Sequence, residues 1–254
     1  EQYGWNDVGF TMDMDGNPPT GDYFPVLTVN ELDEDGSWYI VGYYNFDKKK
    51  HWNHEEETLC VDDLISLADE HWNNKKYKEA AELFLEAAEQ SNAYAQYSIG
   101  YCYENGKGTN QDYRKAVEWY QKAAEQGHAK AQLALGLCYN SGNGVPQNYA
   151  KAVEWFKKAA EQGNADAQAL LGDCYADGNG VEQDYLKAVE WYEKATELGG
   201  VENFWEQRKF GDCYYEIQDY DRAIELYRKV LEESEDYEWY EKDRKEIKEI
   251  IKEA

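Results

Sequence analysis

Basic residues are scarce in this sequence: 26 Lys and Arg stand against 52 Asp and Glu, and the formal net charge is −26. Such a surface repels phosphate groups, so the composition argues against binding to nucleic acid and to an anionic membrane surface. No run of 18 apolar residues occurs, so we predict no membrane-spanning helix. Hydrophobic residues still make up 42% of the chain and aromatic residues 15%, too many for a disordered acidic tail.

Motifs of catalytic nucleophiles and zinc hydrolases are also missing. The sequence contains no S-x-x-K, G-x-S-x-G or H-E-x-x-H. Three G-x-G segments, at 106–108, 142–144 and 178–180, are not followed by Lys-Ser or Lys-Thr. They therefore predict helix-to-helix turns rather than phosphate-binding loops. We predict that the chain is not an enzyme and holds no cofactor.

An internal repeat dominates what is present. Three consecutive blocks of 36 residues share the skeleton A-x-A-Q-x-x-[IL]-G-x-C-Y-x-x-G-x-G-x-x-Q-[DN]-Y-x-K-A-V-E-W-[YF], at 93–128, 129–164 and 165–200. The first two blocks agree at 21 of 36 positions and the last two at 22. Self-similarity at this period is the signature of a solenoid of stacked units.

Each block is predicted to fold as two helices. Apolar and small residues recur in steps of three and four from Ala93 to Tyr103 and again from Tyr113 to Ala124. Asp112 suits the N-cap of the second helix, and the glycines of the G-x-G segment suit a turn because glycine adopts left-handed geometry. One such helix pair cannot bury its apolar face alone, so the pairs must stack.

Small residues mark the positions where two helices are expected to come close. They are Gly100, Gly136 and Gly172 in the first helices and Ala116, Ala152 and Ala188 in the second. A larger side chain there would push the two helices apart. Each second helix also carries a tryptophan that supplies bulk: Trp119, Trp155 and Trp191.

Two shorter relatives of the unit flank the blocks, and both lack the G-x-G segment. The last 20 residues are densely charged, with Ile247, Ile250 and Ile251 on one side, which predicts a helix that caps the stack. The predicted division of the chain is 1–57, 58–92, 93–128, 129–164, 165–200, 201–234 and 235–254.

The three blocks resemble Sel1-like repeats, and the two flanking units resemble tetratricopeptide repeats. The resemblance covers about residues 60–234. It implies an all-α fold, a right-handed α–α superhelix whose first helices line a concave groove. It also implies a role as a scaffold or adaptor that holds partner proteins.

Residues 1–57 lie outside the resemblance. They contain three of the four prolines, and the stretches 24–32 and 37–46 are rich in β-forming residues on either side of Asp35 and Gly36. Because Asp-Gly suits a tight turn, we predict a small β-containing segment, a hairpin or meander packed on the first helix pair.

Two stretches of this N-terminal segment are compared with metal sites. His51 and His54, followed by three glutamates, are adequate ligands, but the same residues fit a solvated linker into the first helix. The stretch from Asp13 resembles the start of a calcium loop. However, Pro18 stands where an EF-hand has glycine and Phe24 where it has the bidentate glutamate. We predict no metal site.

The cysteines follow the repeat. Cys102, Cys138 and Cys174 occupy the same place in successive first helices. Adjacent helix axes lie about 8–10 Å apart, whereas a disulfide needs Cα atoms within about 7 Å, so we predict buried thiols. Some secreted Sel1-like proteins have two bridged cysteines per repeat, a pattern that is not matched here. Reduced thiols favour a cytoplasmic location. Glu1 rather than Met stands first, which is also compatible with a trimmed chain or a removed signal peptide.

The resemblance also implies which residues line the groove. Counted from the small residue of each first helix, the candidate partner-binding residues are Trp72, Tyr97, Tyr101, Glu104, Leu133, Leu137, Asn140, Asp173, Asp177, Arg208, Asp212 and Tyr215. The same face continues with Asp69, Asn73, Asn105, Ser141, Ala169 and Glu216. Ordinary solvated helix surface is the alternative for each of them.

Charge is uneven along the repeats, because the first two blocks are near neutral and the third block and both ends are acidic. Solubility alone is one explanation. The other is a protein or peptide partner with an apolar anchor near Tyr97, Tyr101, Leu133 and Leu137. Its basic residues would lie beside an acidic end formed by Asp173, Asp177, Asp212 and Glu216.

Two further functions are weighed against this scaffold. Family analogy alone suggests a secreted hydrolase of the β-lactamase type, for which the chain offers no catalytic motif. In the third hypothesis, the chain is an assembly module whose residues 1–57 carry the function.

Overall fold

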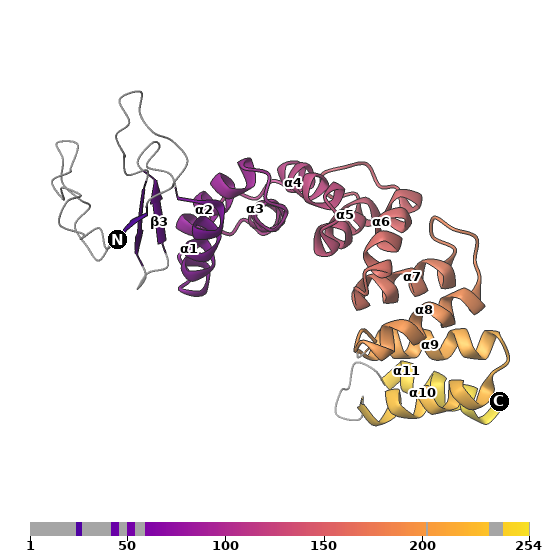
Figure 1. The fold of residues 1–254 in the computed structure, drawn as a ribbon. Helices are drawn as coiled ribbons and strands as arrows, with labels where there is room; N and C mark the ends of the chain where they lie inside the picture. The colour runs from indigo at the N-terminus through magenta and orange to yellow at the C-terminus, as the bar shows by residue number, and fades with distance from the viewer. Residues whose placement is uncertain are drawn as a thin grey trace, which may run out of the picture. The chain divides into compact units, whose positions relative to one another are not determined.

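The structure, a computed structural model, describes residues 24–26, 42–45, 50–53, 59–201, 203–233 and 241–253 (Figure 1). The chain divides into two compact units, Glu1–Gln90 and Ser91–Ala254. From α1 onward the described chain is helical apart from its turns, which confirms the predicted fold class.

The first unit contains three short strands: β1 (Phe24–Val26), β2 (Gly42–Asn45) and β3 (Lys50–Asn53). They form an antiparallel sheet in the order β1-β2-β3, with Phe24 opposite Tyr44 and Tyr43 opposite Trp52. The prediction of a linker at residues 51–57 is wrong for residues 51–53, which pair with β2 and belong to strand β3. The predicted Asp35-Gly36 turn, the calcium-like stretch and His54 lie outside the described residues.

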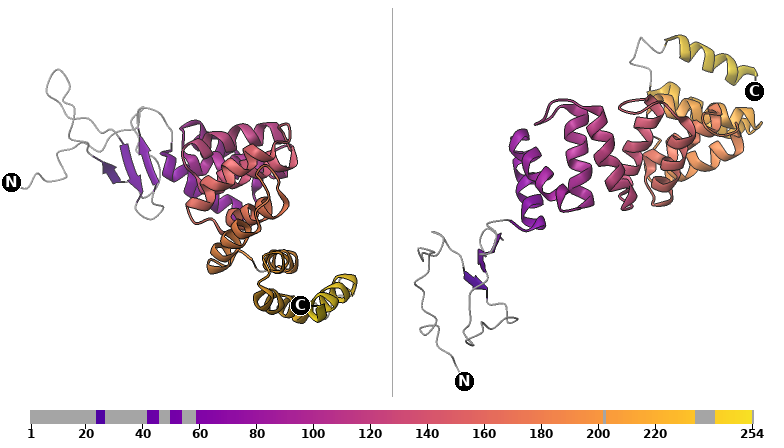
Figure 2. Two further views of the ribbon diagram at one scale, coloured as in Figure 1. Left: turned by 90° about the vertical axis from the view of Figure 1, so that its right-hand side faces the viewer. Right: turned by 90° about the horizontal axis from the view of Figure 1, so that it is seen from above.

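Eleven helices complete the described chain. The first unit has α1 (Val61–Asn73) and α2 (Tyr77–Glu89). The second unit has α3 (Ala93–Asn105), α4 (Tyr113–Glu125), α5 (Ala129–Ser141), α6 (Tyr149–Glu161), α7 (Ala165–Asp177), α8 (Tyr185–Glu197), α9 (Phe204–Glu216), α10 (Tyr220–Glu233) and α11 (Glu241–Glu253). Within the second unit, α3 to α10 form antiparallel pairs that stack as a solenoid (Figure 2).

Local sequence explains where these helices begin and end. The first helices start at Asn92, His128 and Asn164, whose side chains accept a hydrogen bond from the backbone N–H three residues later, at 3.0, 3.2 and 2.8 Å. Asp112 caps α4 in the same way, as predicted. Gly106 ends α3 in the left-handed conformation (φ 65°), which glycine adopts without strain.

A glycine in each first helix receives an aromatic ring from the second helix of its pair. A Cβ atom on Gly136 would lie 2.5 Å from a ring carbon of Phe156, and one on Gly100 would lie 2.7 Å from Tyr120. Both rings are fully buried. The predicted close contact between paired helices is confirmed.

Buried glutamines join one repeat to the next. The Nε2 atom of Gln132 donates to the carbonyl of Ala124 in the preceding repeat (3.1 Å), and its Oε1 accepts from Gln162 in its own repeat (2.7 Å). Gln168 makes the same backbone bond (3.1 Å), but Leu198 stands where the partner glutamine belongs. The Oε1 atom of Gln168 is therefore buried without a hydrogen bond.

The second glycine of the second and third G-x-G segments also contacts the preceding repeat. Gly144 has φ +75°, and a Cβ atom there would lie 2.3 Å from the carbonyl oxygen of Tyr113. Gly180 lies equally close to Tyr149. The predicted turns are thus also contacts between repeats, where only glycine fits.

The repeated tryptophans pack between neighbouring pairs. Trp155 packs against the core cluster of α4 and α5, and Trp191 against that of α6 and α7. The outer side of each ring is covered by a lysine three residues later, Lys158 at 3.9 Å and Lys194 at 4.1 Å from the ring centroid.

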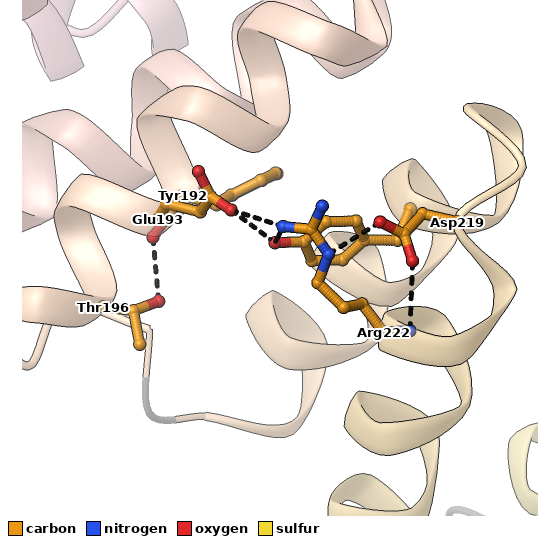
Figure 3. A network of polar contacts seen from close by, with 6 residues as sticks. Tyr192, Glu193, Thr196, Asp219 and Arg222 are labelled. Atoms are coloured by element: carbon orange, nitrogen blue, oxygen red, sulfur yellow. Dashed lines mark hydrogen bonds and ion pairs between the residues drawn. The ribbon is translucent and has the colours of Figure 1, made fainter.

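A polar network joins the last Sel1-like block to the pair α9–α10 (Figure 3). Arg222 Nη1 donates to Glu193 Oε1 (2.9 Å), and Arg222 Nε donates to Asp219 (2.6 Å). The hydroxyl of Tyr214 donates to the same Glu193 oxygen (2.7 Å). Three helices, α8, α9 and α10, therefore meet at one carboxylate.

The final helix closes the stack. Ile247 of α11 is fully buried in the cluster that contains Tyr227 and Val230, and Ile250 and Ile251 pack against it. Of the charged residues of α11, Lys245, Glu249 and Lys252 are exposed, while Asp243 and Glu246 pair with Arg208 of α9.

Candidate functional site

The predicted binding residues of the second unit lie on one face of α3, α5, α7 and α9. We call this the first-helix face, and define it by the residue directly after each helix glycine: Tyr101, Leu137, Asp173 and Asp212. Residues three, four and seven positions away share the face because an α-helix has 3.6 residues per turn.

Aromatic side chains cover the α3 end of the face. The Tyr97 ring stacks on His128 with centroids 5.0 Å apart and lies 5.8 Å from Tyr120. Burial raises the pKa of Tyr97, and the nearby Tyr101 and Glu104 add to that effect. The hydroxyl of Tyr97 therefore stays protonated at physiological pH.

Aliphatic and amide groups follow on α5. Leu137 is 40% exposed, whereas Leu133 is half-buried against the core cluster of α6 and α7. Asn140 is half-buried, and its backbone carbonyl accepts from Gln147 Nε2 (2.8 Å). Leu137 is thus the accessible apolar group of this helix face.

Three predicted acids bind the hydroxyls of buried tyrosines. Tyr120 donates to Glu104 (2.7 Å), Tyr192 to Asp173 (2.6 Å) and Tyr227 to Asp212 (2.7 Å). Burial, together with the accepting carboxylate, raises the pKa of all three tyrosines strongly. In the second block the ring is Phe156, and no acid stands at Leu137 or Asn140. These carboxylates therefore help to hold the helix pairs together.

A lysine that was not among the predicted residues neutralises part of the acidic end. Lys209 Nζ lies 2.9 Å from Asp173 and 2.7 Å from Asp177, so it links α9 to α7. The equivalent positions in the three blocks hold Ser98, Ala134 and Leu170, and the change to lysine was the available signal.

Arg208 links α9 to the capping helix. It pairs with Asp243, with Glu246 (3.1 Å) and, more distantly, with Asp212 (3.9 Å). This predicted binding residue is therefore engaged with three carboxylates of the protein itself.

A cavity of about 430 Å³ opens between α7 and α9. Its lining consists of Asp173, Trp205, Glu206, Arg208, Lys209 and Asp212. Trp205 is 56% exposed, the highest value among the aromatic side chains that are described as exposed. It was missed because the prediction counted only from three residues before each glycine, and Trp205 lies six before.

Two predicted residues make their aromatic contacts locally. Trp72, in the first unit, has its ring 4.9 Å from Tyr77 and 6.4 Å from Phe84. Tyr215 packs edge-on to Tyr220, with centroids 5.3 Å apart. Both are half-buried.

The repeated cysteines offer little reactivity. All five cysteines lie in the described residues and are free thiols. Burial raises the pKa of Cys102, Cys138, Cys174 and Cys213 to about 12, so these thiols remain protonated at neutral pH.

Metal ligation and membrane insertion find no support in the described ranges. These ranges contain no group of three or more His, Cys, Asp or Glu side chains that could hold a metal ion. No helix within them has the length and apolarity needed to cross a bilayer.

Solved structures with related folds agree with this description. The chain is 38% identical to c5321, a protective antigen of uropathogenic Escherichia coli strains with an SLR fold (TM-score 0.62). That match covers 68% of this chain but only 38% of c5321, so this chain spans well under half of that relative. A Sel1 repeat protein from Oxalobacter formigenes is 34% identical, with 67% of this chain and 70% of that chain covered (TM-score 0.59). YrrB, a tetratricopeptide protein with an unusual peptide-binding site, shares the fold at 19% identity, with 70% and 88% covered (TM-score 0.50).

Family models cover the repeats directly. The Sel1 repeat model matches residues 74–92, 93–128, 129–164 and 165–200, together half of the chain, and a tetratricopeptide repeat model matches 209–237. No curated protein matches the chain. With these repeats, their stacked helix pairs and the relatives above, the chain belongs to the Sel1 repeat family of solenoid proteins.

Proposed function

We propose that this protein is a non-catalytic scaffold that binds a segment of a partner protein along its first-helix face. Solenoids of the Sel1 and tetratricopeptide type are commonly protein-interaction scaffolds, which gives the general function. The face, the kind of partner and the position of its anchors are the specific content of the proposal.

One observation carries the proposal. Among the described residues of α3, α5, α7 and α9, the large hydrophobic side chains that are exposed are Tyr94 (41%), Leu137 (40%) and Trp205 (56%). Tyr94 and Trp205 lie six residues before their helix glycines and Leu137 one after, a difference of seven that places all three on the same face. Aromatic and aliphatic groups at an accessible surface are effective anchors for a partner.

Charge suggests the chemistry of the partner. Lys209 pairs with two aspartates and Arg208 with three carboxylates, so each cation is surrounded by more negative than positive charge. The α7–α9 end of the face keeps an excess of negative charge after internal pairing. A partner segment with basic residues at that end and an apolar residue over Leu137 fits both features.

The test compares two exposed leucines. Leu137→Lys places a cation on the first-helix face, whereas Leu186→Lys makes the same change on α8 at a side chain that is 63% exposed. Both variants and the parent chain are used to capture proteins from lysate of the source cell, with mass spectrometry as the readout. We expect a specifically captured protein to be lost with Leu137→Lys and kept with Leu186→Lys.

Equal capture by both variants would contradict binding at the first-helix face. In that case, a chain lacking residues 1–57 tests the remaining hypothesis that the N-terminal segment carries the function. A far-ultraviolet circular dichroism spectrum of each variant confirms that the helices remain folded.

A further inference from the structure

We propose that the cavity between α7 and α9 is a subsite for an arginine side chain of the partner, stacked on Trp205. This inference rests on the proposed function and adds the residue type that is recognised at one end of the first-helix face.

The aromatic wall of the cavity is held in place. The Trp205 ring packs edge-on against Phe204, with centroids 5.1 Å apart and planes at 87°. Phe204 is itself buried in the core cluster of α7 to α11. Trp205 therefore presents an exposed indole from a rigid base, and an indole face is the best aromatic partner for a cation.

The charges around the cavity favour a cation over an anion. Lys209 is neutralised by Asp173 and Asp177, and Arg208 by Asp212 and two acids of α11. Glu206 adds a further carboxylate to the lining. The lining thus holds two cations and three carboxylates, and three further acids pair with the same two cations. An incoming anion would meet cations whose charge is already balanced.

One carboxylate oxygen is positioned to accept from the ligand. The hydroxyl of Tyr192 (2.6 Å) and the ammonium group of Lys209 (2.9 Å) both reach Asp173 Oδ1. Both contacts are made to Oδ1, and the Asp173 side chain is 31% exposed. These two contacts hold the carboxylate in one orientation, and the proposal assigns its other oxygen, Oδ2, as the acceptor for the guanidinium.

Arginine satisfies these features better than lysine. Its planar guanidinium stacks on an aromatic face while its N–H groups donate in the same plane to a carboxylate. An ammonium group is a more strongly hydrated point charge and cannot stack. We therefore expect a preference for arginine over lysine, and for both over a neutral analogue.

The experiment uses Nα-acetyl-L-arginine amide and the full chain labelled with ¹⁵N. The indole N–H signal of Trp205 is assigned as the one lost in Trp205→Phe. We expect arginine amide to shift this signal saturably at millimolar concentration, the range of about −4 kcal/mol that suits one side chain. The neutral isostere, Nα-acetyl-L-citrulline amide, should bind at least about tenfold more weakly, because it lacks the charge.

Asp173→Asn supplies the second arm, since asparagine can still accept from Tyr192 while losing the charge. It should weaken arginine binding several-fold and leave the helical circular dichroism spectrum unchanged. The proposal fails if arginine amide gives no saturable shift up to about 50 mM, a weaker affinity than any useful subsite. It also fails if citrulline amide or inorganic phosphate shifts the signal as strongly as arginine amide does.

The outcome is separable from that of the leucine test. Loss of capture by Leu137→Lys without any arginine response would retain the binding face and reject the subsite. A saturable arginine response with capture that ignores Leu137 would retain the subsite and move the main anchor elsewhere.

Discussion

The two halves of the first-helix face differ in their chemistry, although the same frame of stacked helix pairs lies beneath both. At α3 and α5 the face carries rings and an exposed leucine, with Tyr97 stacked on His128. At α7 and α9 it carries ion pairs centred on Lys209 and Arg208. The helix pairs beneath are alike, because each has its glycine, its buried ring and its buried glutamine. A repeat protein can therefore vary its surface while it preserves the contacts that hold the repeats together.

The largest expected effect tests the shared frame. Gly136→Leu drives a side chain into Phe156, and Gly172→Leu does the same to Tyr192, where the Cβ distance is 2.7 Å. We expect each to lower the free energy of unfolding by about 3 kcal/mol, near the upper end of the usual cost of overpacking, because the new side chain forces the helices apart. Chemical denaturation followed by circular dichroism measures the change.

Gly163→Ala serves as the control for that pair. No atom lies within 4 Å of a Cβ at Gly163, so only its left-handed backbone (φ +80°) opposes alanine, at a cost of about 1–2 kcal/mol. If Gly172→Leu proved no worse than Gly163→Ala, the two halves would not share the frame described above.

Lys209→Met is the next largest change and acts on the ionic half alone. Without the lysine, Asp173 and Asp177 lose their shared cation and repel each other. We expect a loss of about 1 kcal/mol in the free energy of unfolding at low salt, since partly exposed ion pairs contribute at that level. The loss should shrink near 1 M salt, where the screening length falls to about 3 Å.

The matched substitution is Lys78→Met in α2. Lys78 is 79% exposed and lies 3.9 Å from Glu82, so we expect little change at either salt concentration. A Lys209→Met effect that is independent of salt would assign its cost to lost packing of the lysine stem rather than to charge.

Leu198→Gln would complete the buried glutamine contact that lacks its partner at Gln168 of α7. A glutamine there can donate to the buried Oε1 atom of Gln168, as Gln162 does to Gln132 at 2.7 Å. We expect a gain of about 1 kcal/mol in the free energy of unfolding, the usual net value of one internal hydrogen bond. A rise in the thermal midpoint measures it.

Leu186→Gln, on the exposed side of α8, provides the comparison. It removes an exposed leucine without reaching a buried acceptor, and should leave the thermal midpoint nearly unchanged. Equal stabilisation by both substitutions would show that the gain comes from replacing exposed leucine and not from the glutamine contact.

The smallest expected effect concerns pH and the aromatic half. Neutral Nδ1 of His128 accepts from Ala131 N–H at the start of α5 (3.2 Å), and burial lowers the pKa of this histidine. The unfolded chain therefore takes up the proton at higher pH than the folded chain does. The contribution of His128 to stability is present above its ordinary pKa near 6.5 and declines as pH falls below that value.

His128→Asn should remove that decline, because asparagine caps the equivalent helices at Asn92 and Asn164 without titrating in this range. Denaturation of both proteins at pH 7.5 and 5.5 gives the comparison. Subtracting the free energies of unfolding of the two proteins at each pH removes the contribution of the many carboxylates, which both proteins share. A difference that stays constant with pH would show that His128 does not lose its cap on protonation.

Local patterns predicted most of the frame. The helices, the caps such as Asp112 and the contact between Gly136 and its ring all follow from spacing within one repeat. The contacts between successive repeats could not be predicted in this way. Gly144 must be glycine because a backbone carbonyl of the preceding repeat lies against it. That requirement has no trace in the local pattern beyond the recurrence of glycine itself.

The face was harder to predict than the frame. Counting positions along the first helices located Leu137 and Asp173, but it could not separate a ligand-facing acid from one that binds a buried tyrosine. The sequence did hold a signal, since the block with Phe156 instead of tyrosine also lacks the acid. Lys209 was missed because it departs from the residues at the equivalent positions of the blocks, and Trp205 because it lies six residues before its glycine, outside the positions that were counted.

The contacts between successive repeats affect how such chains can change in length. Gln132 and Gly144 both reach back to the preceding repeat, to Ala124 and Tyr113. The third block carries the equivalent pair, with Gln168 bonded to Ala160 and Gly180 close to Tyr149. A block that is duplicated or excised whole brings or removes its links together and leaves the neighbours matched. The length of the binding surface can thus change in steps of one 36-residue block without unmatched contacts between the remaining repeats. Leu198 lies at the point where the 36-residue blocks stop and a different kind of unit begins.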